Sequence, residues 1–171
     1  MLLPLPSVAR RAAGFTLLEI LVVMALLGIV LGIAVVRLDD GGERVTRTRA
    51  EELGLRLEAA RDEAVYAGQP LAFSTDGEGY KFWRGDTARQ QWFALAQNAG
   101  ELAPRALGED VRIVAQTVNG QPRPLGERLV FNADGMTDPF VLVVQGRARA
   151  LRVEGDALGR VSVDAEATRA D

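Results

Sequence analysis

The residue types on which most enzymatic and metal chemistry depends are absent from this sequence. Its 171 residues include no histidine and no cysteine. Histidine is the most frequent general base and metal ligand, and cysteine supplies thiolate ligands and disulfides. Catalytic triads, histidine-based zinc sites and disulfide bonds are therefore excluded. The sequence also has no glycine-rich phosphate loop and no nucleophile elbow, so we expect a protein that is not an enzyme and has no cofactor.

Three oxygen-bearing side chains, Asn132, Asp134 and Asp138, are close enough in sequence to suggest a calcium loop. Their spacing does not match that of an EF-hand. Asparagine, aspartate and glycine are also the residues that favour tight turns. We therefore predict a polar hairpin turn at this position and no metal site.

Four aromatic side chains gather in the middle of the chain, at Tyr80, Phe82, Trp83 and Trp92. Aromatic rings in a basic groove can stack on the bases of single-stranded nucleic acid. Arg84 and Arg89 supply positive charge nearby, but the chain as a whole has a net charge of -3. Proteins that bind nucleic acid through phosphate contacts are normally basic. We therefore interpret the aromatic group as part of a sheet core and expect no nucleic-acid partner.

One acidic side chain, Glu19, lies near the start of an otherwise apolar run over residues 15–36. A helix of about 20 residues is enough to cross a bilayer, whereas a secretory signal peptide has a shorter apolar region. Arg10 and Arg11 precede the run and orient the N-terminus toward the cytoplasm. A carboxylate inside a bilayer costs about 2.5–3.5 kcal/mol. Glu19 is therefore either functional or close enough to the headgroups to reach water, as in a plain signal anchor.

Residues 14–19, Gly-Phe-Thr-Leu-Leu-Glu, resemble the cleavage signal of type IV pilins and type II secretion pseudopilins. The resemblance implies that a prepilin peptidase cuts after Gly14 and N-methylates Phe15, which makes Glu19 the fifth residue of the mature chain. The apolar run then stays in the mature protein, where it first anchors the subunit and later packs in a filament core. In a filament, Glu19 is expected to neutralise the α-amine of Phe15 in a neighbouring subunit, which offsets the cost of burying both charges.

The sequence after the apolar run predicts an amphipathic helix. Apolar residues recur at spacings of three and four and form one stripe, made of Ala50, Leu53, Leu57, Ala60 and Ala64. Paired glycines each weaken a helix by about 1 kcal/mol relative to alanine, so we expect a bend, a fray or a short break at residues 39–42. Gly68 and Pro70 mark the end of the helix.

From residue 69 onward, the spacing of apolar residues changes from that of a helix to that of strands. Strands are predicted over residues 71–75, 80–84, 91–95, 111–118, 128–132, 140–145, 148–153 and 159–163, with residues 96–108 as a loop. The sequence therefore divides into a leader (1–14), a membrane-spanning and filament-core helix segment (15–36), an amphipathic continuation of that helix (37–68), a β-rich domain (69–164) and a flexible tail (165–171).

The globular part is similar to H-type minor pseudopilins of type II secretion, the GspH group. The similar segments are residues 63–70 at the helix end, the aromatic strand 79–83, and residues 131–140, where Ala133 replaces the usual proline. The resemblance implies an α+β pilin-like fold, in which a long N-terminal helix packs on a mostly antiparallel β-sheet domain. FimT/FimU-type minor pilins of pilus assembly or DNA uptake share this fold and are the alternative.

The resemblance also implies a location and a set of partners. The subunit is expected to cross the bacterial inner membrane once, with its globular domain in the periplasm, and to help form the tip of a pseudopilus that exports folded proteins. Expected partners are the minor pseudopilins of the I, J and K types, the major G-type pseudopilin and, for processing, the prepilin peptidase.

The cleavage site gives a first prediction. Replacing Gly14 with leucine places a bulky side chain where the resemblance requires glycine, so the chain is expected to remain an unprocessed, membrane-held precursor. Intact-mass measurement and N-terminal sequencing of the membrane fraction check this expectation. A Ser7→Leu variant changes the leader by a similar volume away from the cut and should be processed normally. A wild-type mature chain that starts anywhere other than at methylated Phe15 would contradict the assignment.

Overall fold

The structure is a computed structural model that describes residues 17–165, with the backbone alone described for residues 30–41 and 165. The chain forms two compact units, Met1–Leu38 and Asp39–Asp171. The leader, Gly14 and Phe15 lie outside the described residues, as do residues 166–171 of the predicted tail.

The described residues of the first unit all belong to helix α1 (Leu17–Ala67), which continues into the second unit. The side chains of residues 17–29 are exposed, and most of them are apolar. Within the part of the chain that the structure describes, no helix is long and apolar enough to cross a membrane.

Helix α1 continues through Gly41 and Gly42 without interruption. The predicted fray or break at residues 39–42 is therefore wrong. Two glycines together cost a helix about 2 kcal/mol. An interruption of the helix would break several of its hydrogen bonds, and the residues that follow would then need a second, unfavourable helix nucleation. The hydroxyl of Thr46 also donates a hydrogen bond of 2.8 Å to the carbonyl of Gly42.

The predicted end of the helix is confirmed, and its geometry explains the glycine. The amide of Gly68 donates to the carbonyl of Val65 at 3.3 Å, and the amide of Gln69 donates to the carbonyl of Ala64 at 3.2 Å. These two bonds form a Schellman motif, which needs a left-handed residue just after the helix. Gly68 adopts this conformation with φ of 62° at no steric cost.

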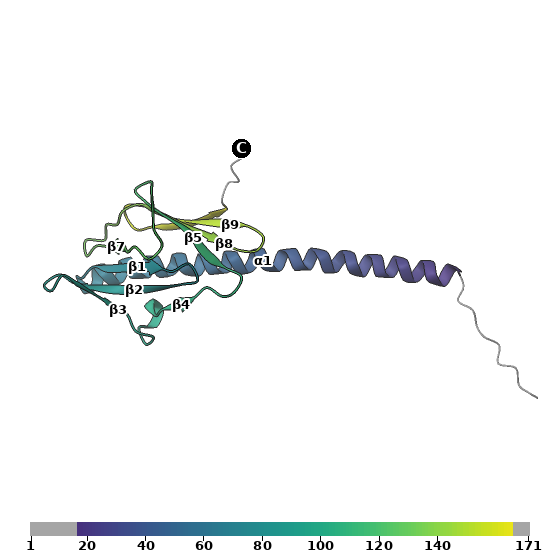
Figure 1. The fold of residues 1–171 in the computed structure, drawn as a ribbon, viewed down its shortest axis with the longest axis horizontal. Coiled ribbons are helices and arrows are strands. Elements are labelled where there is room, and N and C mark those ends of the chain that lie inside the picture. Colours follow the sequence, from purple (N-terminus) through teal and green to yellow (C-terminus); the bar gives the residue numbers. More distant parts are fainter. Residues whose placement is uncertain (1–16, 166–171) are drawn as a thin grey trace, which may run out of the picture. The chain divides into compact units, whose positions relative to one another are not determined.

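The predicted apolar stripe of α1 is confirmed as the centre of the core. All five of its residues are fully buried, and they pack in one cluster with apolar side chains from both sheets. Figure 1 shows the C-terminal half of α1 running beside the strands of both sheets. Three of the five stripe residues are small alanines, which allows the helix to approach the strands closely.

The first sheet is antiparallel, with the strand order β3-β2-β1-β7 and with β4 also paired to β2. The predicted hairpin over residues 71–84 is confirmed as β1 paired with β2. Every residue of β1 is buried, because this strand lies in the interior of the sheet. The strands of this sheet are β1 (Leu71–Thr75), β2 (Gly79–Asp86), β3 (Gln91–Ala94), β4 (Arg105–Ala106) and β7 (Leu129–Phe131).

The second sheet is also antiparallel, with the order β10-β9-β8-β5-β6. Buried and half-exposed residues alternate along β8 and β9, as expected for a sheet with one face on the core. Its strands are β5 (Arg112–Val118), β6 (Gln121–Arg123), β8 (Phe140–Gln145), β9 (Ala150–Gly155) and β10 (Val161–Ala165).

The sequence periodicity misses three short elements. A 3-10 turn, η1 (Gly100–Leu102), and β4 both fall in the predicted loop over residues 96–108, so that prediction is wrong in part. β6 falls in a stretch for which no strand is predicted. β4 has two residues and β6 has three, which is too short to show a period. β6 also contains Pro122, which is tolerated because β6 is an edge strand.

Glycine allows close packing at two positions of the second sheet. A Cβ atom at Gly146 would clash with the side chain of Thr46 on α1. A Cβ atom at Gly155 would clash with the ring of Phe140, its cross-strand partner. Any other residue at these positions would force the helix or the ring away from the sheet.

Two leucines of α1 provide a matched test of the core. Leu57 is fully buried, whereas Leu55 is 68% exposed. Leu57→Ala is expected to lower the free energy of unfolding by about 2–5 kcal/mol, because it leaves a cavity between helix and sheets. Leu55→Ala makes the same chemical change with an expected effect within about 0.5 kcal/mol. Near-UV circular dichroism during denaturation in mild detergent checks both values, and equal losses would contradict this assignment of the core.

Candidate assembly sites

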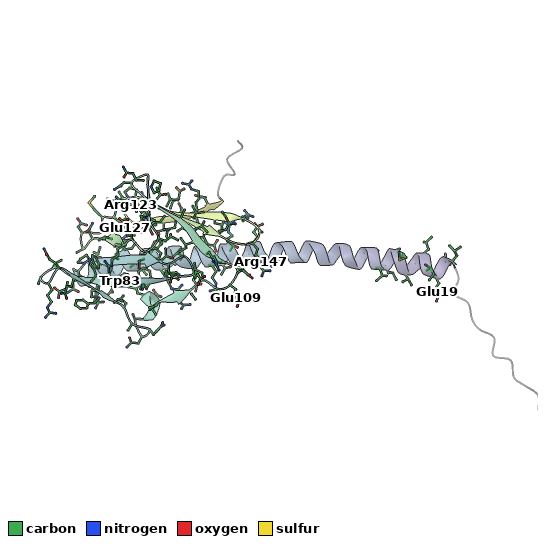
Figure 2. The ribbon with its side chains drawn as sticks, in the orientation of Figure 1. Glu19, Trp83, Glu109, Arg123, Glu127 and Arg147 are labelled. Carbon is green, nitrogen blue, oxygen red and sulfur yellow. The ribbon has the colours of Figure 1, made fainter. Side chains whose placement is uncertain are left out.

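Glu19 lies in the first turn of α1 as the structure describes it, and its side chain is exposed (Figure 2). An acidic residue near the start of a helix is favoured by the helix dipole. Phe15, its predicted partner across subunits, lies outside the described residues. The pairing of Glu19 with an α-amine therefore stays a prediction.

Two of the three residues considered for a calcium loop, Asn132 and Asp134, lie in a hairpin turn between Phe131 and Thr137, and Asp138 lies just beyond it. The amide of Gly135 donates to the carbonyl of Asn132 at 3.0 Å, and the carboxylate of Asp134 accepts a hydrogen bond of 2.9 Å from the amide of Met136. The carboxylate of Asp134 is thus used to close the turn. Among residues 17–165, no group of acidic side chains is arranged to hold a metal ion.

The four aromatic residues do not form one cluster. Tyr80 and Phe82 face the core, where each ring lies 5.8 Å from the ring of Phe73. Trp83 is adjacent to Phe82 in a strand, so its side chain points to the opposite face of the sheet. The interpretation as sheet core is confirmed for Tyr80 and Phe82 and is wrong for Trp83 and Trp92, which are only half-buried.

The outer face of the first sheet carries a cluster that the sequence did not reveal. The indole of Trp83 donates a hydrogen bond of 2.8 Å from Nε1 to the hydroxyl of Ser74. The guanidinium of Arg128 lies 4.3 Å from the ring centroid of Trp83 and 5.9 Å from that of Trp92, and Nζ of Lys81 lies 4.9 Å from the Trp83 ring. We call these five residues the tryptophan face.

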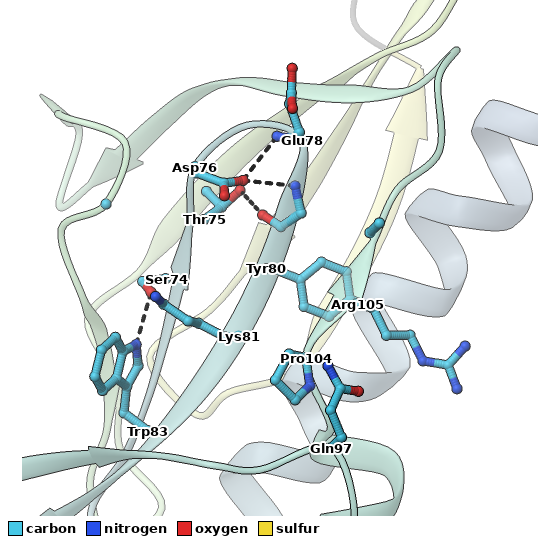
Figure 3. A pocket seen from close by; sticks show the side chains of 13 residues that line it. Ser74, Thr75, Asp76, Glu78, Tyr80, Lys81, Trp83, Gln97, Pro104 and Arg105 are labelled. Carbon is cyan, nitrogen blue, oxygen red and sulfur yellow. Dashed lines mark hydrogen bonds between the residues drawn. The ribbon is translucent and has the colours of Figure 1, made fainter.

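The tryptophan face borders a groove of about 490 Å³. Figure 3 shows Trp83, Ser74 and Lys81 lying together, with Asp76 and Glu78 at the hairpin turn between β1 and β2. The carboxylate of Asp76 accepts hydrogen bonds from the amides of Glu78 and Gly79. The groove is lined by Ser74, Lys81, Trp83, Gln97, Arg105 and Gly126, among others.

The arginines near the C-terminus do not form a basic stripe for DNA. Each of the four that the structure describes lies beside an acidic side chain, in the pairs Arg147–Asp110, Arg149–Glu43, Arg152–Glu154 and Arg160–Asp156. Hydrogen bonds from the backbone and side chain of Arg160, together with one from the amide of Leu158, hold the pKa of Asp156 below its usual range. The charges are therefore neutralised locally.

Glu52 is the centre of an ion-pair network between α1 and the first sheet. Its carboxylate lies 2.9 Å from Arg49, 3.1 Å from Arg56 and 3.4 Å from Arg105. Partial burial raises the pKa of Glu52, but hydrogen bonds and charges from Arg49 and Arg56 outweigh it, so the pKa lies below its usual value. Arg56 also donates to the hydroxyl of Tyr80 at 3.1 Å, and burial raises the pKa of that hydroxyl.

Two known protein families match this chain. The family described as Type II transport protein GspH matches residues 49–159, and the Prokaryotic N-terminal methylation motif matches residues 9–35. The chain belongs to the GspH family. The GspH match covers the second half of α1 and the strands from β1 to β9, and the methylation motif covers the predicted cleavage signal at residues 14–19.

Two relatives of this GspH-family chain have similar lengths. Type II secretion system protein H of Pseudomonas aeruginosa is 28% identical over 176 residues, which cover 90% of this chain and 98% of the relative. Type II secretion system protein H of Escherichia coli K12 is 32% identical over 145 residues, which cover 79% of this chain and 82% of the relative.

Two solved structures have a similar fold. The minor pseudopilin EpsH from the type 2 secretion system of Vibrio cholerae superposes with a TM-score of 0.59 at 17% identity, covering 74% of this chain and 99% of that structure. The solution structure of Escherichia coli GspH has a TM-score of 0.58 at 21% identity, covering 74% and 92%. The predicted α+β pilin-like fold is thereby confirmed.

Family membership confirms the function expected from the sequence, that of a minor pseudopilin in type II secretion, and does not favour the FimT/FimU-type alternative. The methylation motif and the family together indicate a membrane-anchored periplasmic protein.

The Glu52 network gives a prediction about pH. Because the folded-state pKa of Glu52 is lowered from about 4.5, its stabilisation is present above that value and is lost as the pH falls through the folded pKa. Glu52→Gln is expected to lower the free energy of unfolding at pH 7 by about 1 kcal/mol or less, because the pairs are partly exposed. The difference from wild type should shrink below about pH 4. Thermal unfolding of both proteins at pH 7 and at pH 3 checks this expectation.

Glu51→Gln provides the control for that experiment. Glu51 is next to Glu52 in the sequence. Among the described residues it forms one ion pair, an exposed one with Arg47 at 2.9 Å. Its effect at pH 7 is expected to be smaller than that of Glu52→Gln. A Glu52→Gln deficit that persists unchanged at pH 3 would contradict the assigned network.

Proposed function

We propose that this minor pseudopilin is cut after Gly14, is N-methylated at Phe15, and joins a periplasmic pseudopilus through its N-terminal helix. In this proposal the chain crosses the inner membrane once and acts as a structural subunit rather than as an enzyme. The observation that carries the proposal is the presence of both family matches in one chain. The methylation motif lies on the N-terminal segment, and the GspH match lies on the globular unit.

Glu19 has the central role in assembly. A carboxylate in an otherwise apolar segment is costly unless a positive group compensates for it. Cleavage before Phe15 creates such a group, the α-amine of the mature chain. If subunits stack in a filament, the Glu19 carboxylate of one subunit meets the Phe15 α-amine of its neighbour. Pairing lowers the cost of burying both charges and fixes the axial position of the subunit.

The proposed partners are the other pseudopilins of the assembly, of the I, J, K and G types, with the prepilin peptidase as the processing enzyme. The folded unit is expected to contact the minor pseudopilins near the tip of the pseudopilus. The local pairing of the C-terminal arginines with acids supports a protein assembly over a role in DNA uptake.

Replacing Glu19 tests the assembly role. Removal of one partner from a buried ion pair typically costs about 3–5 kcal/mol. Glu19→Gln is therefore expected to be processed and inserted normally, yet to be depleted from pseudopili and to reduce secretion in a strain that lacks the native subunit. Intact mass, membrane fractionation and co-purification with the major pseudopilin separate processing from assembly.

Glu51→Gln makes the same chemical change on the exposed side of α1 and should assemble normally. Normal assembly and secretion by Glu19→Gln would show that the glutamate is only a tolerated polar residue in a membrane anchor. Failure of cleavage, by contrast, would place the role of Glu19 in recognition by the peptidase.

A further inference from the structure

The tryptophan face holds two positive charges that no carboxylate neutralises. Ser74 pairs in register with Lys81, and Phe73 pairs with Leu129, so Arg128 flanks Ser74 on its other side. Lys81 and Arg128 therefore stand in one row across the outer face of the sheet, with the Trp83 indole bonded to Ser74 between them.

This arrangement differs from the rest of the folded unit. Of the arginines whose side chains the structure describes, all but Arg44 and Arg128 lie within 4.0 Å of a carboxylate. Lys81, the only lysine of the sequence, also has no such neighbour among the described residues. Two of the three uncompensated cations thus lie over the same indole ring.

Stacking positions these cations without using their hydrogen-bond donors. A cation–π contact is made by the charge of the guanidinium or ammonium group and occupies none of its N–H donors with a hydrogen-bond acceptor. Within residues 17–165, the side chains of Arg128 and Lys81 donate no hydrogen bond to another protein group. Trp83 is itself fixed by its bond to Ser74. The donors are therefore held in place and available to an external acceptor.

The neighbouring groove determines which kind of acceptor fits. Its volume of about 490 Å³ is in the range of about 300–1,000 Å³ that is usual for binding pockets. The groove also contains the carboxylates of Asp76 and Glu78, and the whole chain carries a net charge of -3. Arg105 also lines the groove, but its guanidinium is paired with Glu52. Asp76 and Glu78 would repel a polyphosphate chain that extends past Lys81 and Arg128, whereas one or two carboxylates on a short segment need contact only these two cations.

From this charge complementarity we infer that the tryptophan face and its groove bind an acidic segment of a partner protein. The segment presents a carboxylate to the N–H edge of Arg128 and a second acidic group to the ammonium of Lys81. Its chain lies over the indole of Trp83. This binding site is separate from the N-terminal helix and does not depend on the role proposed for Glu19.

Indole fluorescence of the full chain in zwitterionic detergent tests the inference, because both tryptophans of the sequence lie close to Arg128. The probe is a capped peptide containing Glu-Gly-Glu, and its uncharged counterpart contains Gln-Gly-Gln. The acidic peptide is expected to give a saturable change that the amide peptide does not give. Lys81→Gln with Arg128→Gln should weaken binding by about tenfold or more, since hydrogen bonds to charged groups are lost.

Control variants test whether peptide binding depends on the two cations of the tryptophan face in particular. Arg147→Gln with Arg152→Gln removes the same charge from pairs outside the tryptophan face and should leave the affinity within about twofold. Arg128→Lys keeps the charge but loses the planar fork, so an intermediate affinity is expected. Circular dichroism of each variant confirms that it is folded.

Three outcomes would overturn the inference. The first is the absence of saturable binding, or an equal response to the acidic and amide peptides. The second is tighter binding of a short oligothymidylate than of the acidic peptide, which would assign the face to single-stranded nucleic acid. The third is self-association that Arg128→Gln abolishes without any peptide present, which would assign it to a second copy of this chain.

Discussion

The folded unit depends on the burial of one apolar stripe of α1 against two sheets. The stripe residues are fully buried and belong to the same core as Phe73 of the first sheet and Leu142 of the second. Each sheet has only one face directed to this core, so the helix supplies the apolar surface that both sheets share. Glycine at Gly146 allows the helix to approach the second sheet, and the Schellman motif at Gly68 turns the chain into β1. The helix thus sets the position of both sheets.

Most arginines on the surface of this unit are paired with neighbouring acidic side chains. Glu52 contacts three arginines, and the four described arginines between residues 147 and 160 each lie beside an acid. Such pairs are partly exposed and contribute little to stability individually, but they remove long-range attraction for polyanions. Lys81 and Arg128 differ from these pairs, because they lie over aromatic rings rather than beside carboxylates. Two of the positive charges that no described carboxylate neutralises therefore lie on one face of one sheet.

The same helix serves a second purpose before its amphipathic part begins. Its exposed apolar residues from Leu17 to Ile29 are unsuited to water, and Glu19 lies among them. In the proposed assembly, cleavage before Phe15 retains this segment and creates the α-amine with which Glu19 of a neighbouring subunit pairs. In that proposal, the division of the chain at Leu38 and Asp39 separates the residues that join subunits from the unit that holds the described core.

Features that depend on neighbouring residues were predictable from the sequence. The apolar run with Glu19, the helical stripe, the helix end at Gly68 and the hairpin over residues 71–84 each follow from local spacing or local turn chemistry. The continuity of α1 through Gly42 was not predictable, because it depends on helix cooperativity rather than on glycine propensity. Strands β4 and β6 are too short to show a period, so only pairing with β2 and β5 defines them. The tertiary structure alone brought Arg128 onto Trp83. Alternation along a strand assigns side chains to two faces of the sheet but does not show which face the core covers. The pairing of β1 with the distant β7 places Arg128 on the same face as Trp83.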